Sequence, residues 1–399
     1  MLLIIFAEQK FNRFLVIFTK LKKETHMKTL SWMLLLGIWL FISACRPETV
    51  SGFRVLVLDH ADQIEPDMEL PLDVLSMQVE AIPLETTDRC LIKEISYLEE
   101  SREFYWLVSD NRICKFDKTG HFLQYIGASG QGPQEFLSPK TIQPVEKEQA
   151  LYVMDYFGRK MNVYAFDGRF LSSFKLPEET WIDNFRYKDG KIYYLTTGNS
   201  VMPDLYRYDI QAGRVDTLCK RDREMGTEGF MGQTFTYNLD NDLYMFHYFN
   251  DTVYRIRENK IEPAWLFYIG KLKWTFDELT LVADYTPKVR PDGPRMQIFD
   301  LFETNDYGFV FYSMSQFKGE HMKAFMALYD KKLDRFYPHV NLVSEETPWK
   351  SVEKGKMLVK TSVPGSLYAV REAFDLAGKN GFETLKEDDN PVLLRYVCK

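Results

Sequence analysis

A glycine-rich loop followed by turn-linked apolar segments is the feature that most constrains the fold of this chain. The loop begins at Gly127, and the segments 151–155, 161–166 and 170–176 come after it. These segments are rich in β-branched and aromatic residues, a composition typical of β-strands. The pair Asp167-Gly168 between the last two segments favours a hairpin turn, because glycine adopts positive φ without strain. The stretch therefore predicts a compact antiparallel unit.

Units of this kind recur along the chain. Val108-Ser109-Asp110 aligns with Val153-Met154-Asp155, and weaker copies begin near residues 191, 242, 309 and 365. Six units over residues 85–399 give about 52 residues each, a period near that of kelch-like β-propellers. One unit has too little core to stand alone and must stack on its neighbours. We therefore predict an all-β fold, a six-bladed β-propeller of four-stranded antiparallel blades. A β-sandwich or two all-β domains is the alternative.

The two ends of the predicted ring indicate how it closes. The segment 79–85 contains Pro83, which cannot donate to a β-ladder and so favours an edge strand. We expect this strand to complete the outer rim of the blade that contains residues 392–397. Residues 371–386 show helical periodicity, which predicts a small helical insert in this last blade.

The N-terminus has the features of a targeting segment. Residues 30–44 form an uncharged apolar run that follows Lys28, and this run is shorter than the ~20 residues that span a bilayer. Ile42-Ser43-Ala44-Cys45 is similar to a bacterial lipobox, in which the signal is cut before the cysteine and the sulfur is acylated. A membrane anchor followed by a chance cysteine is the alternative.

These features divide the chain into four parts. Residues 1–26 do not fit a signal n-region, so we expect translation to start at Met27. Residues 27–44 are then the lipoprotein signal peptide, 45–67 a tether with a short strand near 53–58, and 68–399 the propeller. The mature protein is predicted to be held by lipid on Cys45 at the bacterial envelope, at the outer membrane, as a monomer.

Charge and cysteine content exclude two classes of protein. The formal net charge is −7 and no dense Lys/Arg stripe occurs beyond the N-terminus, whereas nucleic-acid surfaces are basic. Cys90, Cys114, Cys219 and Cys398 form no C-x-x-C motif, so neither a zinc knuckle nor a redox motif is indicated. We expect these four cysteines to be buried and reduced, with a Cys90–Cys114 disulfide as the alternative.

The glycine-rich loop and the two chain ends resemble a known family. The loop is similar to an NHL-type blade junction, and the ends to those of bacterial six-bladed β-propeller lipoproteins, over about residues 75–399. The residues that carry the resemblance are Gly127-x-x-Gly130-x-Gly132-Pro133-x-Glu135-Phe136-x-x-Pro139, Leu151-Tyr152-Val153-x-Asp155, Ile82-Pro83-Leu84-Glu85 and Asp389-Asn390-Pro391-Val392-Leu393. The resemblance implies an envelope lipoprotein with a binding surface. The loop is not a dinucleotide fingerprint, since the third glycine and the following helix are missing.

Two turns contain the candidate binding residues. Asp110 and Arg112 lie in one, and Asp155 and Arg159 lie in the other, where Tyr156-Phe157 adds two aromatic rings. Paired carboxylates could hold Ca²⁺ or act in acid–base catalysis. The alternative is that each Asp caps the turn that follows it. The aromatic pair is suited to stacking on sugars or peptides.

Among six histidines, His247 is the best candidate for a channel ligand because it lies in a predicted strand. A core or channel histidine without a metal is the alternative. No nucleophile motif of the G-x-S-x-G kind occurs. We therefore predict a non-enzymatic module that binds a peptide, protein or glycan and carries no cofactor. An envelope lyase or hydrolase, with Ca²⁺ or Zn²⁺ or carboxylates in the channel, is the alternative.

Replacing Cys45 with Ser tests the lipid anchor. The Cys45→Ser variant lacks the thiol that takes the thioether-linked lipid, so it is expected to lose acylation and to leave the membrane fraction. Metabolic labelling with a fatty-acid analogue, together with membrane fractionation, measures both effects. Unchanged fractionation and labelling of the variant would contradict the lipobox interpretation.

Overall fold

The computed structural model describes most of the predicted propeller. The described residues are 54–64, 68–175, 181–197, 205–219, 234–239, 242–247, 251–257, 260–274, 292–315, 322–344, 347–352, 359–361, 363 and 365–398. The predicted leader and Cys45 lie outside them. Residues 53–399 form one compact unit. No helix within the described ranges is long and apolar enough to cross a membrane.

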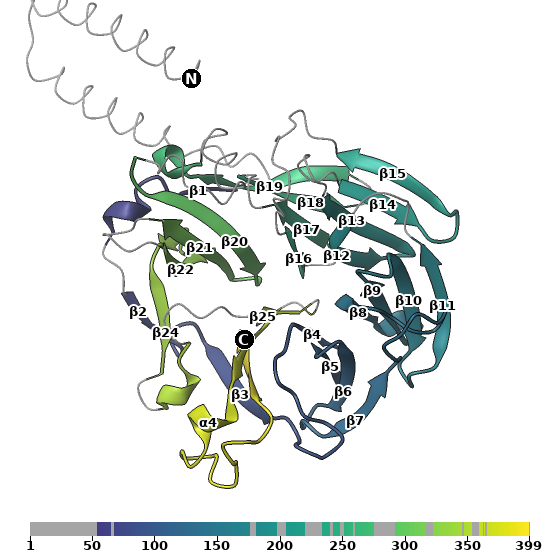
Figure 1. Ribbon diagram of the computed structural model, residues 1–399. Helices are drawn as coiled ribbons and strands as arrows, with labels where there is room; N and C mark the ends of the chain where they lie inside the picture. Colours follow the sequence, from purple (N-terminus) through teal and green to yellow (C-terminus); the bar gives the residue numbers. More distant parts are fainter. Residues whose placement is uncertain are drawn as a thin grey trace, which may run out of the picture. The chain divides into compact units, whose positions relative to one another are not determined.

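Six antiparallel sheets follow one another around a ring, and each is one blade of a β-propeller (Figure 1). In five blades the strands pair in chain order, and in the sixth the outermost strand comes from the N-terminal side of the chain; the first strand in each sheet order lies nearest the centre of the ring. This arrangement confirms the predicted fold class. The helical insert is also confirmed as the short helix α4 (Ala373–Leu376).

The blades are built from the following strands. Blades 1 and 2 are β4 (Tyr97–Glu100), β5 (Phe104–Ser109), β6 (Arg112–Asp117), β7 (Phe122–Ile126), and β8 (Pro139–Val145), β9 (Ala150–Asp155), β10 (Lys160–Ala165), β11 (Phe170–Lys175). Blades 3 and 4 are β12 (Trp181–Lys188), β13 (Lys191–Thr197), β14 (Leu205–Asp209), β15 (Arg214–Cys219), and β16 (Thr234–Leu239), β17 (Asp242–His247), β18 (Thr252–Arg257), β19 (Lys260–Tyr268). Blades 5 and 6 are β20 (Arg295–Glu303), β21 (Tyr307–Ser315), β22 (Met322–Asp330), β23 (Arg335–Tyr337), and β25 (Val359–Lys360), β26 (Ser366–Arg371), β27 (Val392–Cys398), β3 (Met77–Pro83).

Blade 6 closes the ring by combining both ends of the chain. Strand β3, from the N-terminal side, pairs antiparallel with β27, from Val392↔Pro83 to Cys398↔Met77. Pro83 therefore lies in the outermost strand of the blade, as predicted. Asn390 fixes the junction with blade 1: its Oδ1 accepts from Ile92 N at 2.7 Å, and its Nδ2 donates to Glu85 O at 2.7 Å.

Residues 54–64 and 68–71, which precede strand β3 in the chain, pack along the outside of the propeller. Strand β1 (Arg54–Val57) pairs parallel with β19 of blade 4, and β2 (Met68–Pro71) pairs parallel with β24 (Val340–Val343). Leu58 and Ala61 are fully buried, and His339 Nε2 lies 2.9 Å from Ala61 O. The short strand predicted near residues 53–58 is thus present as β1, but residues 54–64 are not the predicted tether, because their apolar side chains add to the core.

Apolar side chains fill the space between neighbouring blades. Trp106 and Val108 of blade 1 pack in one buried cluster with Ile142 and Leu151 of blade 2. Lys115 crosses the same boundary, since its Nζ donates to Phe166 O at 2.7 Å and lies 3.6 Å from the centroid of the Phe104 ring. Burial lowers the pKa of Lys115. Each blade thus completes its core only through its neighbour.

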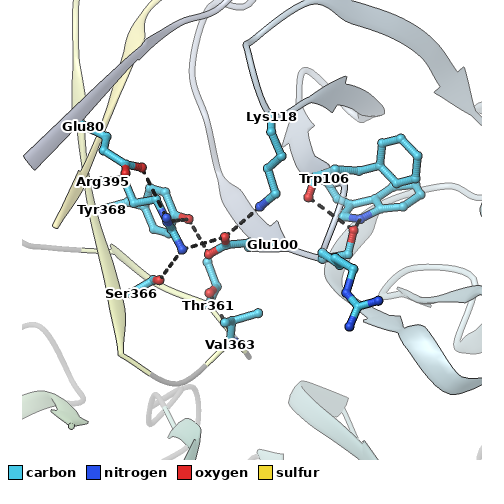
Figure 2. Close-up of polar contacts among 12 residues, drawn as sticks. Glu80, Glu100, Trp106, Lys118, Thr361, Val363, Ser366, Tyr368 and Arg395 are labelled. Carbon is cyan, nitrogen blue, oxygen red and sulfur yellow. Dashed lines mark hydrogen bonds and ion pairs between the residues drawn. The ribbon is translucent and has the colours of Figure 1, made fainter. Parts of the chain in front are cut away.

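A buried ionic junction joins blade 1 to blade 6 (Figure 2). The Glu100 carboxylate, at the end of β4, lies 2.7 Å from Lys118 Nζ and 3.0 Å from Arg395 Nη2, and it accepts from the Tyr368 hydroxyl. Glu100 is 5% exposed. Burial lowers the pKa of Lys118. Arg395 also contacts Glu80 of β3 at 3.2 Å, so the junction includes both halves of the closing blade.

The neighbouring residue of β4 makes a second buried ion pair. Glu99 lies 3.4 Å from Arg186 Nη1 of blade 3, and neither side chain is more than 2% exposed. Arg186 Nη1 also donates to the Tyr97 hydroxyl at 3.0 Å. Burial raises the pKa of Tyr97 to about 12. Consecutive strand residues point to opposite sides, which lets one inner strand contact blades on both sides.

Truncating Arg395 tests the junction. The Arg395→Ala variant is expected to lose about 3 kcal/mol of unfolding free energy, because it removes one of the two cations from a buried carboxylate. Chemical denaturation measures the loss. Lys332→Ala is the control, since it breaks an exposed pair with Asp306 at 2.8 Å and should change the midpoint little. Equal midpoints for the two variants would contradict a structural role for the junction.

Candidate functional site

The predicted site residues of blades 1 and 2 meet at one end of these blades. The β5–β6 and β9–β10 turns join the second strand of a blade to the third, and the loop 127–138 joins β7 to β8. In an antiparallel blade all three connections leave from the same end. The glycine-rich loop is thus the blade junction that the sequence predicts, and it runs between the two turns.

Asp155 fixes the loop to the second turn. Its carboxylate accepts hydrogen bonds from Leu137 N at 3.0 Å, Ser138 N at 2.9 Å and Gly158 N at 3.1 Å. A Cβ at Gly158 would lie 1.9 Å from the carboxylate, so this contact needs glycine. Asp155 is 0% exposed. These contacts support the turn-capping alternative and leave no Asp155 oxygen facing solvent.

The first turn reaches the same loop through a different residue. Asp110 and Asn111 have φ values of 51° and 60°, as both central residues of a type I′ turn do. Asn111 Nδ2 donates to Leu137 O at 3.1 Å. The predicted equivalence of Asp110 and Asp155 is wrong, because β5 ends at Ser109↔Arg112 and β9 at Asp155↔Lys160. The position of Asp155 in blade 2 therefore corresponds to Ser109 in blade 1.

Charged groups surround the first turn. Asp110 lies 3.4 Å from Lys93 Nζ and 3.8 Å from Arg112 Nη2, and all three side chains are more than a third exposed. Arg112 also donates to the Tyr125 hydroxyl at 2.9 Å, and its guanidinium lies 5.1 Å from the centre of that ring. Arg112 is thus held in position while part of its guanidinium faces solvent.

Aromatic and aliphatic side chains protrude beside these charges. Tyr156 and Phe157 pack edge to face with centroids 5.4 Å apart, and Phe157 is 63% exposed. Lys140 Nζ lies 4.3 Å from the centroid of the Tyr156 ring. Leu91 and Leu137 are 53% and 36% exposed. Arg159 is exposed in the same turn as Phe157, with φ 49°.

We call this region the blade 1–2 surface and define it by three exposed apolar side chains and five charged ones. The apolar side chains are Leu91, Leu137 and Phe157, and the charged ones are Lys93, Asp110, Arg112, Lys140 and Arg159. The sequence patterns identified Phe157 and the residues of both turns. They missed Leu91, Leu137, Lys93 and Lys140, which approach the turns only through tertiary contacts.

The predicted channel histidine lies in another blade. His247 is the last residue of β17 and pairs with Thr234, but its side chain is outside the described part of the structure. The described residues contain no group of three His, Cys, Asp or Glu side chains that could hold a metal ion.

Two cysteines meet in the core of blade 1. Cys90 and Cys114 are free and buried, as expected. A hydrogen bond that the Cys114 thiol donates to Cys90, together with burial, raises the pKa of Cys114. Cys219 and Cys398 end their strands with side chains outside the described part.

The fold and this surface define the class of the protein: a six-bladed β-propeller that presents turn residues of two adjacent blades on one surface. The chain belongs to the family described as Domain of unknown function (DUF4934), which matches residues 55–396. The matched residues begin before strand β3 and end within β27, so the match includes both chain ends that form blade 6. No curated protein matches the chain.

Three solved structures match the chain at low sequence identity. A "Putative exported protein" from Bacteroides fragilis NCTC 9343 superposes with a TM-score of 0.65 at 19% identity, covering 87% of this chain and 99% of that one. A member of the duf4221 family from Bacteroides vulgatus has a TM-score of 0.45 at 11% identity, covering 81% and 96%. The virginiamycin B lyase of Staphylococcus aureus has a TM-score of 0.40 at 12% identity, covering 80% and 99%. At these identities the first similarity supports the fold alone.

Removing the Asp155 carboxylate tests its structural role. The Asp155→Ala variant is expected to lose roughly 3 kcal/mol of unfolding free energy, because three backbone N–H groups lose their acceptor at about 1–3 kcal/mol each if they stay buried. Hydrogen exchange at Leu137, Ser138 and Gly158 should accelerate. Asp155→Asn keeps one acceptor oxygen and should lose less. An Asn variant as unstable as the Ala variant would show that charge, not hydrogen bonding, dominates.

Proposed function

We propose that this protein is a lipid-anchored binding module of the bacterial envelope, whose blade 1–2 surface binds an acidic segment of a partner protein. The observation that carries the proposal is the exposed ring of Phe157, 63% accessible, on a turn that Asp155 holds in place. When a partner covers a large apolar side chain on a fixed turn, apolar surface leaves water, and this burial favours binding.

The composition of the surface favours a protein ligand. Protein interfaces combine aromatic residues and arginine at their centre with a polar rim. Phe157 and Leu137 would form such a centre, and Arg112 would lie at its edge. Because both turns are tied to one loop through Leu137, the surface needs little ordering on binding, and a small ordering cost favours affinity.

The charge of the surface favours an acidic partner. Four cations, Lys93, Arg112, Lys140 and Arg159, accompany one exposed carboxylate, Asp110. The whole chain carries a net charge of −7, so this positive region is local. Opposite charge on the partner would raise the association rate, and salt would reduce it.

The envelope location is supported by two observations. Ile42-Ser43-Ala44-Cys45 is similar to a lipobox, and the structurally similar Bacteroides fragilis protein carries the description of an exported protein. Lipid on Cys45 would hold a monomer at the outer membrane with the propeller outside the cytoplasm. A single acyl chain binds a membrane only marginally, so stable anchoring would take a second lipid chain or a further signal.

Selection of peptides on immobilised protein tests the proposal. Random displayed peptides are expected to enrich for Asp and Glu flanking Leu or Phe. The Phe157→Ala variant should bind a selected peptide at least about tenfold more weakly, the loss expected of an interface hot spot. Binding should also weaken with salt and with Arg112→Ala, measured by isothermal titration calorimetry.

Leu333→Ala is the matched control. Leu333 is 67% exposed, but it lies in the β22–β23 turn, which joins third and fourth strands and so leaves from the other end of its blade. Enrichment of neutral or basic peptides would contradict the proposal. So would binding that Leu333→Ala weakens and Phe157→Ala leaves unchanged.

A further inference from the structure

A pocket of about 740 Å³ lies in blade 6, apart from the blade 1–2 surface. One wall is the segment 347–351, which contains the 3₁₀ turn η5 (Pro348–Lys350), and the other is the insert that begins with α4. Small-molecule sites typically enclose about 300–1,000 Å³. The pocket therefore has the volume of a site for a small ligand.

The pocket depends on an insert between the second and third strands of blade 6, a connection that is much shorter in blades 1 and 2. This insert joins β26 to β27 over residues 372–391, whereas the corresponding turn has two residues in blade 1 and four in blade 2. Leu376 and Phe382 anchor it, being 2% and 4% exposed in the core of blade 6. Phe382 in turn packs edge to face against Trp349, with centroids 5.0 Å apart at 80°. Both walls are thus fixed to each other through an indole ring that lines the pocket.

Polar groups of both signs line the pocket. Arg371 is 8% exposed, and its Nη2 donates to Ser351 O at 2.8 Å, which holds the guanidinium between the two walls. Asp375, Lys379 and Asn380 are exposed on the insert and also line the pocket. Two cations, one carboxylate and one amide thus line the pocket.

We infer that this pocket binds a sugar that bears a carboxylate, such as a hexuronate. The indole of Trp349 offers an apolar surface to the C–H groups of a pyranose. Arg371 and Lys379 supply cationic donors for the carboxylate, while Asp375 and Asn380 supply the acceptor and the amide that sugar hydroxyls need. The excess of one positive charge among the lining groups favours an acidic sugar over a neutral one.

Titration with glucuronate tests this inference. Wild-type protein is expected to bind glucuronate with a dissociation constant on the order of 1 mM, and glucose and acetate more weakly. Calorimetry gives the affinity, and saturation-transfer NMR shows whether the sugar ring protons contact the protein. Lys379→Ala should weaken glucuronate binding about tenfold, as loss of a charge-assisted contact does. Trp349→Ala should abolish the transfer signal of the ring protons.

The controls separate this site from other sources of binding. Lys332→Ala removes an exposed lysine of blade 5 and should change nothing. Phe157→Ala should leave glucuronate binding intact, so this inference and the proposed function fail independently. Acetate binding as strong as glucuronate binding would reduce the site to one for any anion and overturn the inference. Equal effects of Lys379→Ala and Lys332→Ala would overturn it as well.

Discussion

Two consecutive buried carboxylates on the first inner strand hold the ring in register. Glu99 contacts Arg186 of blade 3 and Glu100 contacts Arg395 of blade 6. Strand β4 is therefore linked by ion pairs to blades on both sides of it along the ring. Buried ion pairs add little net stability over apolar packing, but a wrong pairing would leave a charge unpaired in the core. The pairs therefore favour this arrangement of blades over any that would leave one of these charges unpaired.

The same principle places the candidate binding surface. Asp155 is a buried carboxylate too, but its partners are backbone N–H groups of a loop and a turn. The loop joins blades 1 and 2, and Asp155 holds both this loop and the turn that contains Phe157. The exposed side chains around Phe157 are therefore restrained by the same hydrogen bonds that fix the blade junction. Blade 6 uses apolar anchors for a similar purpose, with Leu376 and Phe382 holding the insert that forms the pocket. In both places a buried group positions an exposed one.

Much of the fold was predictable from the sequence, and the exceptions have physical causes. The second to fourth strands of blade 2 lie within one residue of the predicted segments 151–155, 161–166 and 170–176, because turns that contain glycine separate them. The first strands of blades 2 to 6 were missed. Strand β8 contains Pro139 and Pro144, which the sequence patterns assign to loops, yet an inner strand pairs on one side only and tolerates them. The role of Asp155 depended on burial, which its spacing could not reveal.

Amide hydrogen exchange of β3 tests the closed ring most directly. If the N-terminal strand completes blade 6 and the junction at Glu100 holds it, the β3 amides that donate to β27 should exchange only through global unfolding, at the same free energy as those of β9. Exchange of β3 by local opening, while β9 stays protected, would contradict the account. It would mean that the ring stays folded without the strand that is said to close it.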